Sequence, residues 1–132
     1  MLNKKVTLPV YLQYLLVGLG SFLGGCLRYA VFQWVDKSQR LSGFLYGTFV
    51  ANFLGTLLIA AITFYFAREI PAKYRFFVTV GFCGGFTTFS TFSFEVFQLL
   101  EKSLYGQALL YVLASLSLSL MAIGIVYYIF HK

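Results

Sequence analysis

Four long apolar runs, separated by short polar segments, constrain the fold of this chain more than any other feature. The runs predict helices over about 8–35, 41–67, 74–100 and 104–130, and they carry few or no charged residues. Each run is longer than the about 20 residues that a helix needs to cross the hydrocarbon core of a membrane. Their apolar residues are continuous rather than alternating, which favours helices over strands.

The composition agrees with a membrane-spanning chain. Only 11% of the 132 residues are charged and 60% are hydrophobic, whereas a soluble domain has about 25% charged residues. Four spanning helices use nearly the whole sequence, so we expect an all-α fold and a single integral membrane domain over residues 1–132. The expected location is the cell membrane, which the chain crosses several times.

The N-terminus superficially resembles a signal peptide, because Lys4 and Lys5 precede an apolar run. That run has no clean cleavage site and continues to Leu27, so we expect a retained first helix. The net charge of +6 does not predict nucleic-acid binding, because the basic residues gather at helix ends, where they can contact anionic lipid. Six of them share the side of the N-terminus and three or four lie opposite, which modestly favours a cytoplasmic N-terminus. The first side holds Lys4, Lys5, Arg68, Lys73, Arg75 and Lys132; the second holds Lys37, Arg40 and Lys102, with Arg28 if it reaches that interface.

Small residues in the first run, Gly20-x-x-x-Gly24 and Ser21-x-x-x-Gly25, predict a close contact with another helix. Arg28 follows at the far end of this run and has two interpretations. It is either a cation whose charged end reaches the membrane interface, or a charge in an aqueous vestibule that raises the local concentration of anions.

Polar side chains lie along one face of the second run. Asn52 is the most informative, because an amide left unpaired in hydrocarbon costs about 4–8 kcal/mol. Thr48 and Thr56 lie four residues to either side and therefore share its face. Two interpretations stay open: the stripe holds helices together, or it lines a path for a polar solute.

The segment from Gly81 to Ser93 has an unusual composition for a spanning helix. It combines three glycines, five hydroxyl side chains and four phenylalanines in thirteen residues. A glycine weakens a helix by about 1 kcal/mol relative to alanine, and a β-branched pair follows them, so we predict a helix break near 84–88. An unbroken, tightly packed helix is the alternative. Carbonyl groups exposed by a break at membrane depth would suit a hard cation such as Na⁺.

Beyond the predicted break, Phe89 and Phe92 are three residues apart and share one helical face, and Ser90 and Ser93 repeat this spacing. Such an aromatic pair is most often part of a core. The positive edge of an aromatic ring can also contact an anion without holding it as tightly as a fixed charge. Glu95 is a functional candidate if it lies inside the membrane, and an ordinary interfacial residue if it lies at the helix end.

In the fourth run, Tyr111, Ser115 and Ser119 follow at intervals of four and place three hydroxyl groups on one face. These groups either bond back to their own helix or donate to an anion that sheds its water. Catalysis is not predicted, because the single His131 is penultimate and no cysteine, histidine and carboxylate residues have the spacing of a metal site. Cys26 and Cys83 fall within spans, where we expect small core residues rather than a disulfide or metal pair.

With these motifs in this order, the chain resembles the Fluc (CrcB) family of fluoride channels over essentially its whole length. The resemblance is carried by Gly24-Gly-Cys-Leu-Arg28, by Gly47-Thr-Phe-Val-Ala-Asn52-Phe-Leu-Gly55-Thr56 and, most specifically, by the segment from Gly81 to Ser93. It implies passive, fluoride-selective export from the cytoplasm across a prokaryotic plasma membrane. It also implies an antiparallel, dual-topology homodimer, surrounded by membrane lipids, with two pores and a structural sodium ion at the interface.

The resemblance further implies roles for single residues. Backbone carbonyls of Gly84 and Thr87 would hold the sodium ion, and Arg28 matches a vestibule arginine. Glu95 and Thr48 match a polar track whose role stays open. The candidates for lining the pore or binding fluoride are Phe89, Phe92, Asn52, Ser90, Thr91, Tyr111, Ser115 and Ser119.

Two other functions compete with fluoride export. A small four-helix, proton-coupled exporter of cations or drugs is the main alternative, but such proteins commonly carry an acid in the first helix, and no Asp or Glu precedes Asp36 here. A non-transporting assembly subunit is the other. Dimerisation is favoured independently, because four helices alone leave little room for a path and its lining. The bias of basic residues fits dual insertion poorly, since dual insertion prefers a near-even count.

Overall fold

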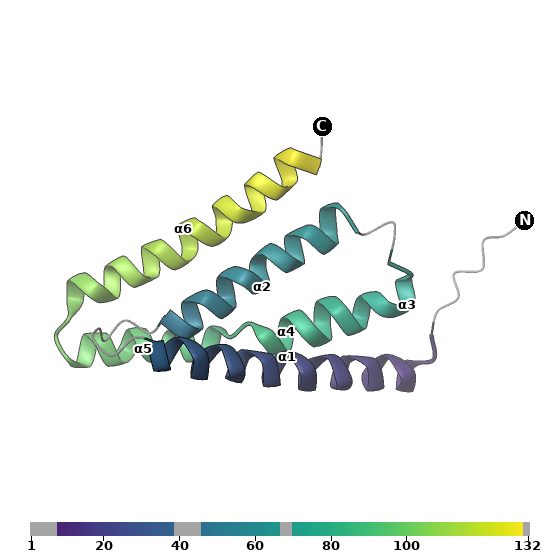
Figure 1. Ribbon diagram of the computed structural model, residues 1–132, viewed down its shortest axis with the longest axis horizontal. Helices are drawn as coiled ribbons and strands as arrows, with labels where there is room; N and C mark the ends of the chain where they lie inside the picture. The colour runs from purple at the N-terminus through teal and green to yellow at the C-terminus, as the bar shows by residue number, and fades with distance from the viewer. Residues whose placement is uncertain (1–7, 39–45, 67–69, 131–132) are drawn as a thin grey trace, which may run out of the picture.

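The computed structural model describes residues 8–38, 46–66 and 70–130, and all regular secondary structure within these ranges is helical (Figure 1). The third span is divided into several pieces, whereas the other three spans are single helices. In chain order the elements are α1 (Val10–Ser38), α2 (Tyr46–Phe64), α3 (Ala72–Arg75), the π-helix η1 (Phe76–Cys83), α4 (Gly84–Phe86), α5 (Phe89–Glu101) and α6 (Tyr105–Phe130).

Four segments are long and apolar enough to cross a membrane, with mean hydropathies from 1.2 to 2.3. They are Val10–Val35, Tyr46–Phe64, Phe76–Glu101 and Tyr105–Phe130. The prediction of an all-α protein with four spans is therefore confirmed for the described residues. The predicted ends of the second helix at 41 and 67 lie outside these residues, as do Lys4, Lys5, Arg40, Arg68, His131 and Lys132. The single domain over residues 1–132 stays a prediction for the same reason.

The four spans run antiparallel to their neighbours in sequence (Figure 1). α1 packs along η1 and α4, α2 packs against α6 and α1, and α5 contacts α6. The start of α1 and the end of α6 lie at the same end of the molecule (Figure 1). This placement agrees with an even number of membrane crossings.

Glycines bring the backbones of α1 and the third span into close contact. A Cβ atom on Gly20 would collide with the carbonyl oxygen of Phe77, and one on Gly24 with that of Phe82. On the opposite helix, a Cβ on Gly85 would lie 2.5 Å from the carbonyl oxygen of Ser21. The predicted close contact is therefore present and lies within one chain, and the described residues leave open space around Gly25, so this glycine has no part in it.

The exterior of the molecule is apolar, as expected for a protein in lipid. Tyr11 and Phe22 on α1 are 75% and 67% exposed, and Leu120 on α6 is 68% exposed. Cys83 is buried and free, as predicted for a small core residue, but Cys26 is exposed, so the prediction of a core position was wrong for it. Its place on the outer face of α1 follows from the inner face being taken by Gly20 and Gly24.

The predicted break of the third span is confirmed. α4 ends at Phe86, and the next two residues are extended, with φ/ψ of −85°/157° at Thr87 and −152°/116° at Thr88. α5 then begins at Phe89. The π-helical turn geometry of η1, just before the break, was not predicted, because no residue type marks such a segment in a sequence.

Candidate functional site at the break of the third span

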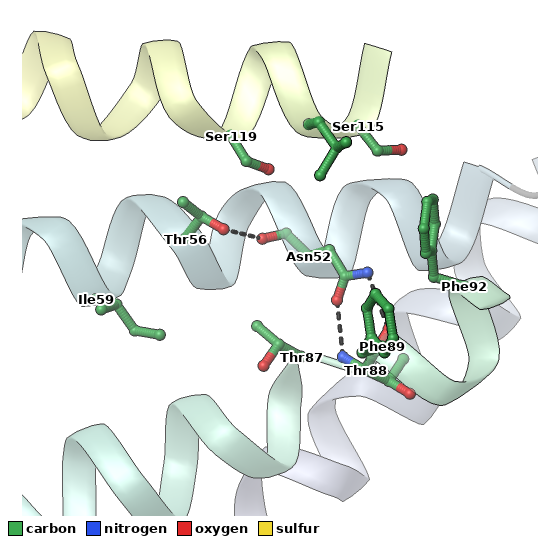
Figure 2. Close-up of a pocket in the computed structure, with 10 residues that line it drawn as sticks. Asn52, Thr56, Ile59, Thr87, Thr88, Phe89, Phe92, Ser115 and Ser119 are labelled. Atoms are coloured by element: carbon green, nitrogen blue, oxygen red, sulfur yellow. Dashed lines mark hydrogen bonds between the residues drawn. The ribbon is translucent and has the colours of Figure 1, made fainter. Parts of the chain in front are cut away.

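The side chain of Asn52 on α2 bonds to the backbone of the break. Its Oδ1 atom accepts from the backbone N–H of Thr88 at 2.7 Å, and its Nδ2 group donates to the carbonyl of the same residue at 3.1 Å (Figure 2). The amide thus satisfies both backbone groups of an extended residue that has no neighbouring strand. Gly55, one turn further along α2, permits the approach, since a Cβ there would collide with the methyl group of Thr87.

Thr88 begins α5 as its N-cap residue. Its Oγ1 atom accepts from the backbone N–H of Thr91 at 3.2 Å, which satisfies one of the free donors at the start of a helix. The same hydroxyl lies 3.0 Å from Thr91 Oγ1 and 3.2 Å from Ser90 Oγ. The predicted pore residues Ser90 and Thr91 therefore surround the cap, Ser90 being exposed and Thr91 half-buried.

The side chains of Asn52 and Thr88 each accept from a backbone N–H that would otherwise bond within the helix. In a continuous α-helix the N–H of Thr88 would bond to the carbonyl of Gly84, and the N–H of Thr91 to the carbonyl of Thr87. Here the first N–H donates to Asn52 and the second to the Thr88 hydroxyl. The carbonyls of Gly84 and Thr87, to which the family resemblance assigned the sodium ion, are thus released from the helical pattern.

Arg28 contacts this break from α1. Its Nη1 group donates to the carbonyl oxygen of Thr87 at 3.3 Å, and its side chain is half-buried. The guanidinium therefore takes the place that the N–H of Thr91 leaves open on this carbonyl. The sequence placed Arg28 near a helix end but gave no sign of its partner.

A pocket of about 260 Å³ lies beside the break, between α2, α5 and α6 (Figure 2). Five of the residues predicted for a pore line it, and the lining combines polar side chains with apolar and aromatic ones. The hydroxyl of Ser119 points from α6 toward α2 (Figure 2). The lining consists of Asn52, Thr56, Ile59, Thr87, Thr88, Phe89, Phe92, Ser115, Leu116 and Ser119.

The hydroxyl of Ser115 stands apart from the other polar groups of the pocket. Its Oγ atom is buried, and no hydrogen-bond partner for it lies within the described part of the chain. Thr56, by contrast, donates back to the carbonyl of Asn52 at 2.8 Å. An unpaired buried hydroxyl is unusual, and it marks Ser115 as a candidate hydrogen-bond donor.

Two aromatic rings border the pocket, and their environments differ. The ring centroids of Phe89 and Phe92 are 6.0 Å apart at an angle of 37°. Phe89 is 79% exposed on the single chain, whereas Phe92 packs toward the core formed by Leu99, Ala108 and Tyr111. The ring of Phe92 lies 5.1 Å from that of Tyr111, so it connects the pocket to the interior of the bundle.

A second polar cluster, formed by Thr48, Glu95 and Tyr111, is buried next to this core. The hydroxyl of Thr48 donates to Glu95 Oε1 at 2.5 Å, and that of Tyr111 donates to Oε2 at 2.7 Å. Thr48 and Tyr111 are each 1% exposed and Glu95 is 7% exposed. Glu95 is therefore buried within the bundle, and it lies inside α5 rather than at its end. Tyr111, which was predicted on one track with Ser115 and Ser119, does not line the pocket and belongs to this cluster instead.

Some of the site was not singled out from the sequence. Thr88 has the most bonds at the break, and its type and place before an apolar helix are an N-cap signal that the sequence offered. Ile59 and Leu116 carry no such signal, because apolar residues of a spanning helix look alike whether they face a pocket or lipid. Ser93, which shares the spacing of Ser90, bonds back to the carbonyl of Phe89 at 2.9 Å.

The fold and the site together define a multi-pass integral membrane protein with a broken span and polar groups gathered beside the break. A family model described as "CrcB-like protein, Camphor Resistance (CrcB)" matches residues 15–127. The chain belongs to this CrcB family, as its resemblance predicted.

Curated relatives support the same assignment. The chain is 41% identical over 116 residues to a protein of Methylobacterium nodulans, with 86% of this chain and 91% of the relative covered. It is 43% identical over 111 residues to one of Thermus thermophilus (83% and 86% covered) and 37% identical over 112 residues to one of Methanosarcina barkeri (85% and 91% covered). The first two are named fluoride-specific ion channel FluC, and the third fluoride-specific ion channel FluC 1.

Proposed function

We propose that this chain is a passive, fluoride-selective channel that exports fluoride from the cytoplasm, and thus not an enzyme. The names of its relatives support fluoride as the transported ion, and the pocket beside the break supports a route for it through the protein. The observation that carries the proposal is that Asn52, Phe89, Phe92, Ser115 and Ser119 come from three different helices and line one pocket. Sequence spacing alone could have placed them on unrelated faces.

The pocket offers what a dehydrating anion needs. Fluoride entering an apolar environment must exchange its water for other hydrogen-bond donors. The Asn52 amide has two N–H hydrogens, one of which bonds to Thr88, so the second is a candidate donor. The Ser115 hydroxyl is another. The edges of the two phenylalanine rings add weak attraction, which favours passage over trapping.

The Thr48–Glu95–Tyr111 cluster continues this polar route in our proposal. Phe92 touches both regions, since it lines the pocket and its ring packs against that of Tyr111. Ser90 and Thr91 lie in the first turn of α5, close to the Thr88 hydroxyl. The hydroxyl groups of Thr48 and Tyr111 reorient easily and could turn from the carboxyl group toward a passing anion.

We further propose an antiparallel homodimer with two pores. The pocket is open on the single chain, and Phe89 on its border is mostly exposed. A path through a membrane needs a closed wall, because water and an anion are not stable against lipid. A second copy of the chain would supply that wall, and two-fold symmetry would then produce two equivalent paths.

The residues at the break fit a structural sodium ion. The carbonyls of Gly84 and Thr87 lose their helical donors to Asn52 and Thr88, and neutral carbonyl oxygens are suitable ligands for a hard cation. The described residues leave open space at Gly84, so a partner chain could approach there. The carbonyl oxygens of Gly84 and Thr87 would hold the ion, and sodium would supply positive charge next to them.

Fluoride efflux from liposomes that contain the purified protein tests the main proposal. A fluoride electrode should record efflux that depends on the protein, and chloride-loaded vesicles should give none. Equal passage of chloride would refute selectivity, and proton-dependent cation uptake abolished by Glu95→Gln would favour the exporter instead. Leu109→Ala, on the exposed outer face of α6, is a suitable control for the purification and reconstitution of a variant.

A further inference from the structure

Arg28 and the proposed sodium ion would both bind the carbonyl oxygen of Thr87. The guanidinium donates to the Thr87 carbonyl oxygen at 3.3 Å, and this carbonyl is one of the two that the break releases for a cation. A carbonyl oxygen has two lone pairs, so a second contact is geometrically possible. The second contact would nevertheless place two positive charges on one oxygen, where they repel strongly at the reduced dielectric of a protein.

The contact has a clear use in a chain without the ion. The N–H that would normally bond to the Thr87 carbonyl donates to the Thr88 hydroxyl instead. An unpaired carbonyl at membrane depth is costly. The guanidinium offsets that cost, and it does so with a group that carries the same sign of charge as sodium.

We propose that Arg28 competes with sodium for the Thr87 carbonyl and thereby sets how tightly the break holds the cation. This inference rests on the proposed sodium site. Arg28 is then an affinity-determining residue of the cation site, in addition to any effect on anions nearby. Competition is reciprocal, so sodium binding must weaken the contact between Arg28 and Thr87 by the same factor.

The test measures sodium binding through stability, without transport. A ligand that binds the folded protein raises its melting temperature in a concentration-dependent way. The full chain in detergent is heated over a series of sodium concentrations, with N-methylglucamine holding the ionic strength constant. The sodium concentration that gives half of the maximal shift is compared between wild type, Arg28→Gln, which removes the charge, and Arg28→Lys, which keeps it.

We expect Arg28→Gln to lower the half-stabilising sodium concentration at least tenfold, and Arg28→Lys to stay within about threefold of wild type. Arg75→Gln removes a positive charge from an exposed residue of α3 and is the matched control, with an expected change below about twofold. If wild type responds to sodium and Arg28→Gln responds equally or more weakly, competition is refuted while the sodium site stands. If sodium changes the melting temperature of neither protein, the sodium site is refuted, and this inference is refuted with it.

A second measurement uses the wild-type protein and does not depend on the folding of a neutral variant. The nitrogen-15 NMR signal of the Arg28 side chain, assigned by its loss in Arg28→Lys, should shift as sodium is added. Its midpoint should match that of the melting-temperature series. An Arg28 signal that stays unchanged while sodium stabilises the protein would overturn the competition.

Discussion

Replacing Asn52 by leucine should destabilise the protein by breaking the link between α2 and the helix break. Leucine has nearly the same size but neither hydrogen-bonding atom. The backbone N–H and carbonyl of Thr88 would lose their 2.7 Å and 3.1 Å bonds. Thr88 is only 7% exposed, so water could not replace these bonds fully. Each unpaired buried group costs about 1–3 kcal/mol.

Hydrogen bonds between helices in membranes contribute less on average, about 0.6 kcal/mol, because the unfolded chain in a membrane also finds partners. We therefore use the lower limit for each group and expect Asn52→Leu to lower the free energy of unfolding by about 2 kcal/mol. Titration of the protein in mixed micelles with a denaturing detergent measures this quantity directly.

Thr79→Val is the matched control for the loss of one polar side chain within the third span. The hydroxyl of Thr79 bonds back to the carbonyl of Arg75 at 2.7 Å and is exposed, so it links no helices. Its replacement should change the free energy of unfolding by less than about 0.5 kcal/mol. An Asn52→Leu protein as stable as the Thr79→Val protein would refute the bonds to Thr88 as a source of stability.

Three further outcomes follow from the same contacts. Gly24→Ala should destabilise the protein by about 1–3 kcal/mol, because the new methyl group meets the backbone of the third span. Gly25→Ala is the control and should be neutral or stabilising, because the described residues leave open space around Gly25. Equal unfolding curves for the two variants would contradict the close packing of α1 on the third span. Tyr111→Phe should cost about 1 kcal/mol in detergent unfolding, because it removes one bond to Glu95, and an unchanged curve would show that bond to be absent. Ser115→Ala should leave stability unchanged or higher, because it removes an unpaired buried hydroxyl, yet slow fluoride efflux; unchanged efflux would remove this hydroxyl from the route.

Much of the fold could be predicted from the sequence, because membrane spans are set by length and hydropathy alone. The four runs became four apolar helical segments, and the glycine cluster with the following threonine pair became the break. Both are local signals. The predicted contact of Gly20 and Gly24 was correct for a similar reason. Small residues one turn apart form a groove on the helix surface, and this groove is a local feature that does not depend on which helix packs into it.

The partners of polar residues could not be predicted, because spacing along one helix does not say which other helix lies opposite. Asn52 and Thr48 share a face of α2, yet one bonds to the backbone of the break and the other to Glu95. Tyr111 and Ser115 share a face of α6, and they lie in different clusters. A helical face is wide enough to meet two neighbours, and the packing of those neighbours decides which side chain meets which.

The break shows how one local irregularity can provide groups of both polarities inside a membrane. Asn52 and Thr88 bind two backbone N–H groups with side-chain oxygens, and this frees two carbonyl acceptors without leaving the donors unpaired. The acceptors suit a cation, whereas the second amide hydrogen of Asn52 and the Ser115 hydroxyl are donors that suit an anion. Because Asn52 both frees the Gly84 carbonyl and supplies a donor, its loss should disturb the cation and the anion together, whereas Ser115→Ala should affect the anion alone. A variant that affects only the anion, beside one that affects both ions, would show that the break supports two separate binding sites and not a single one.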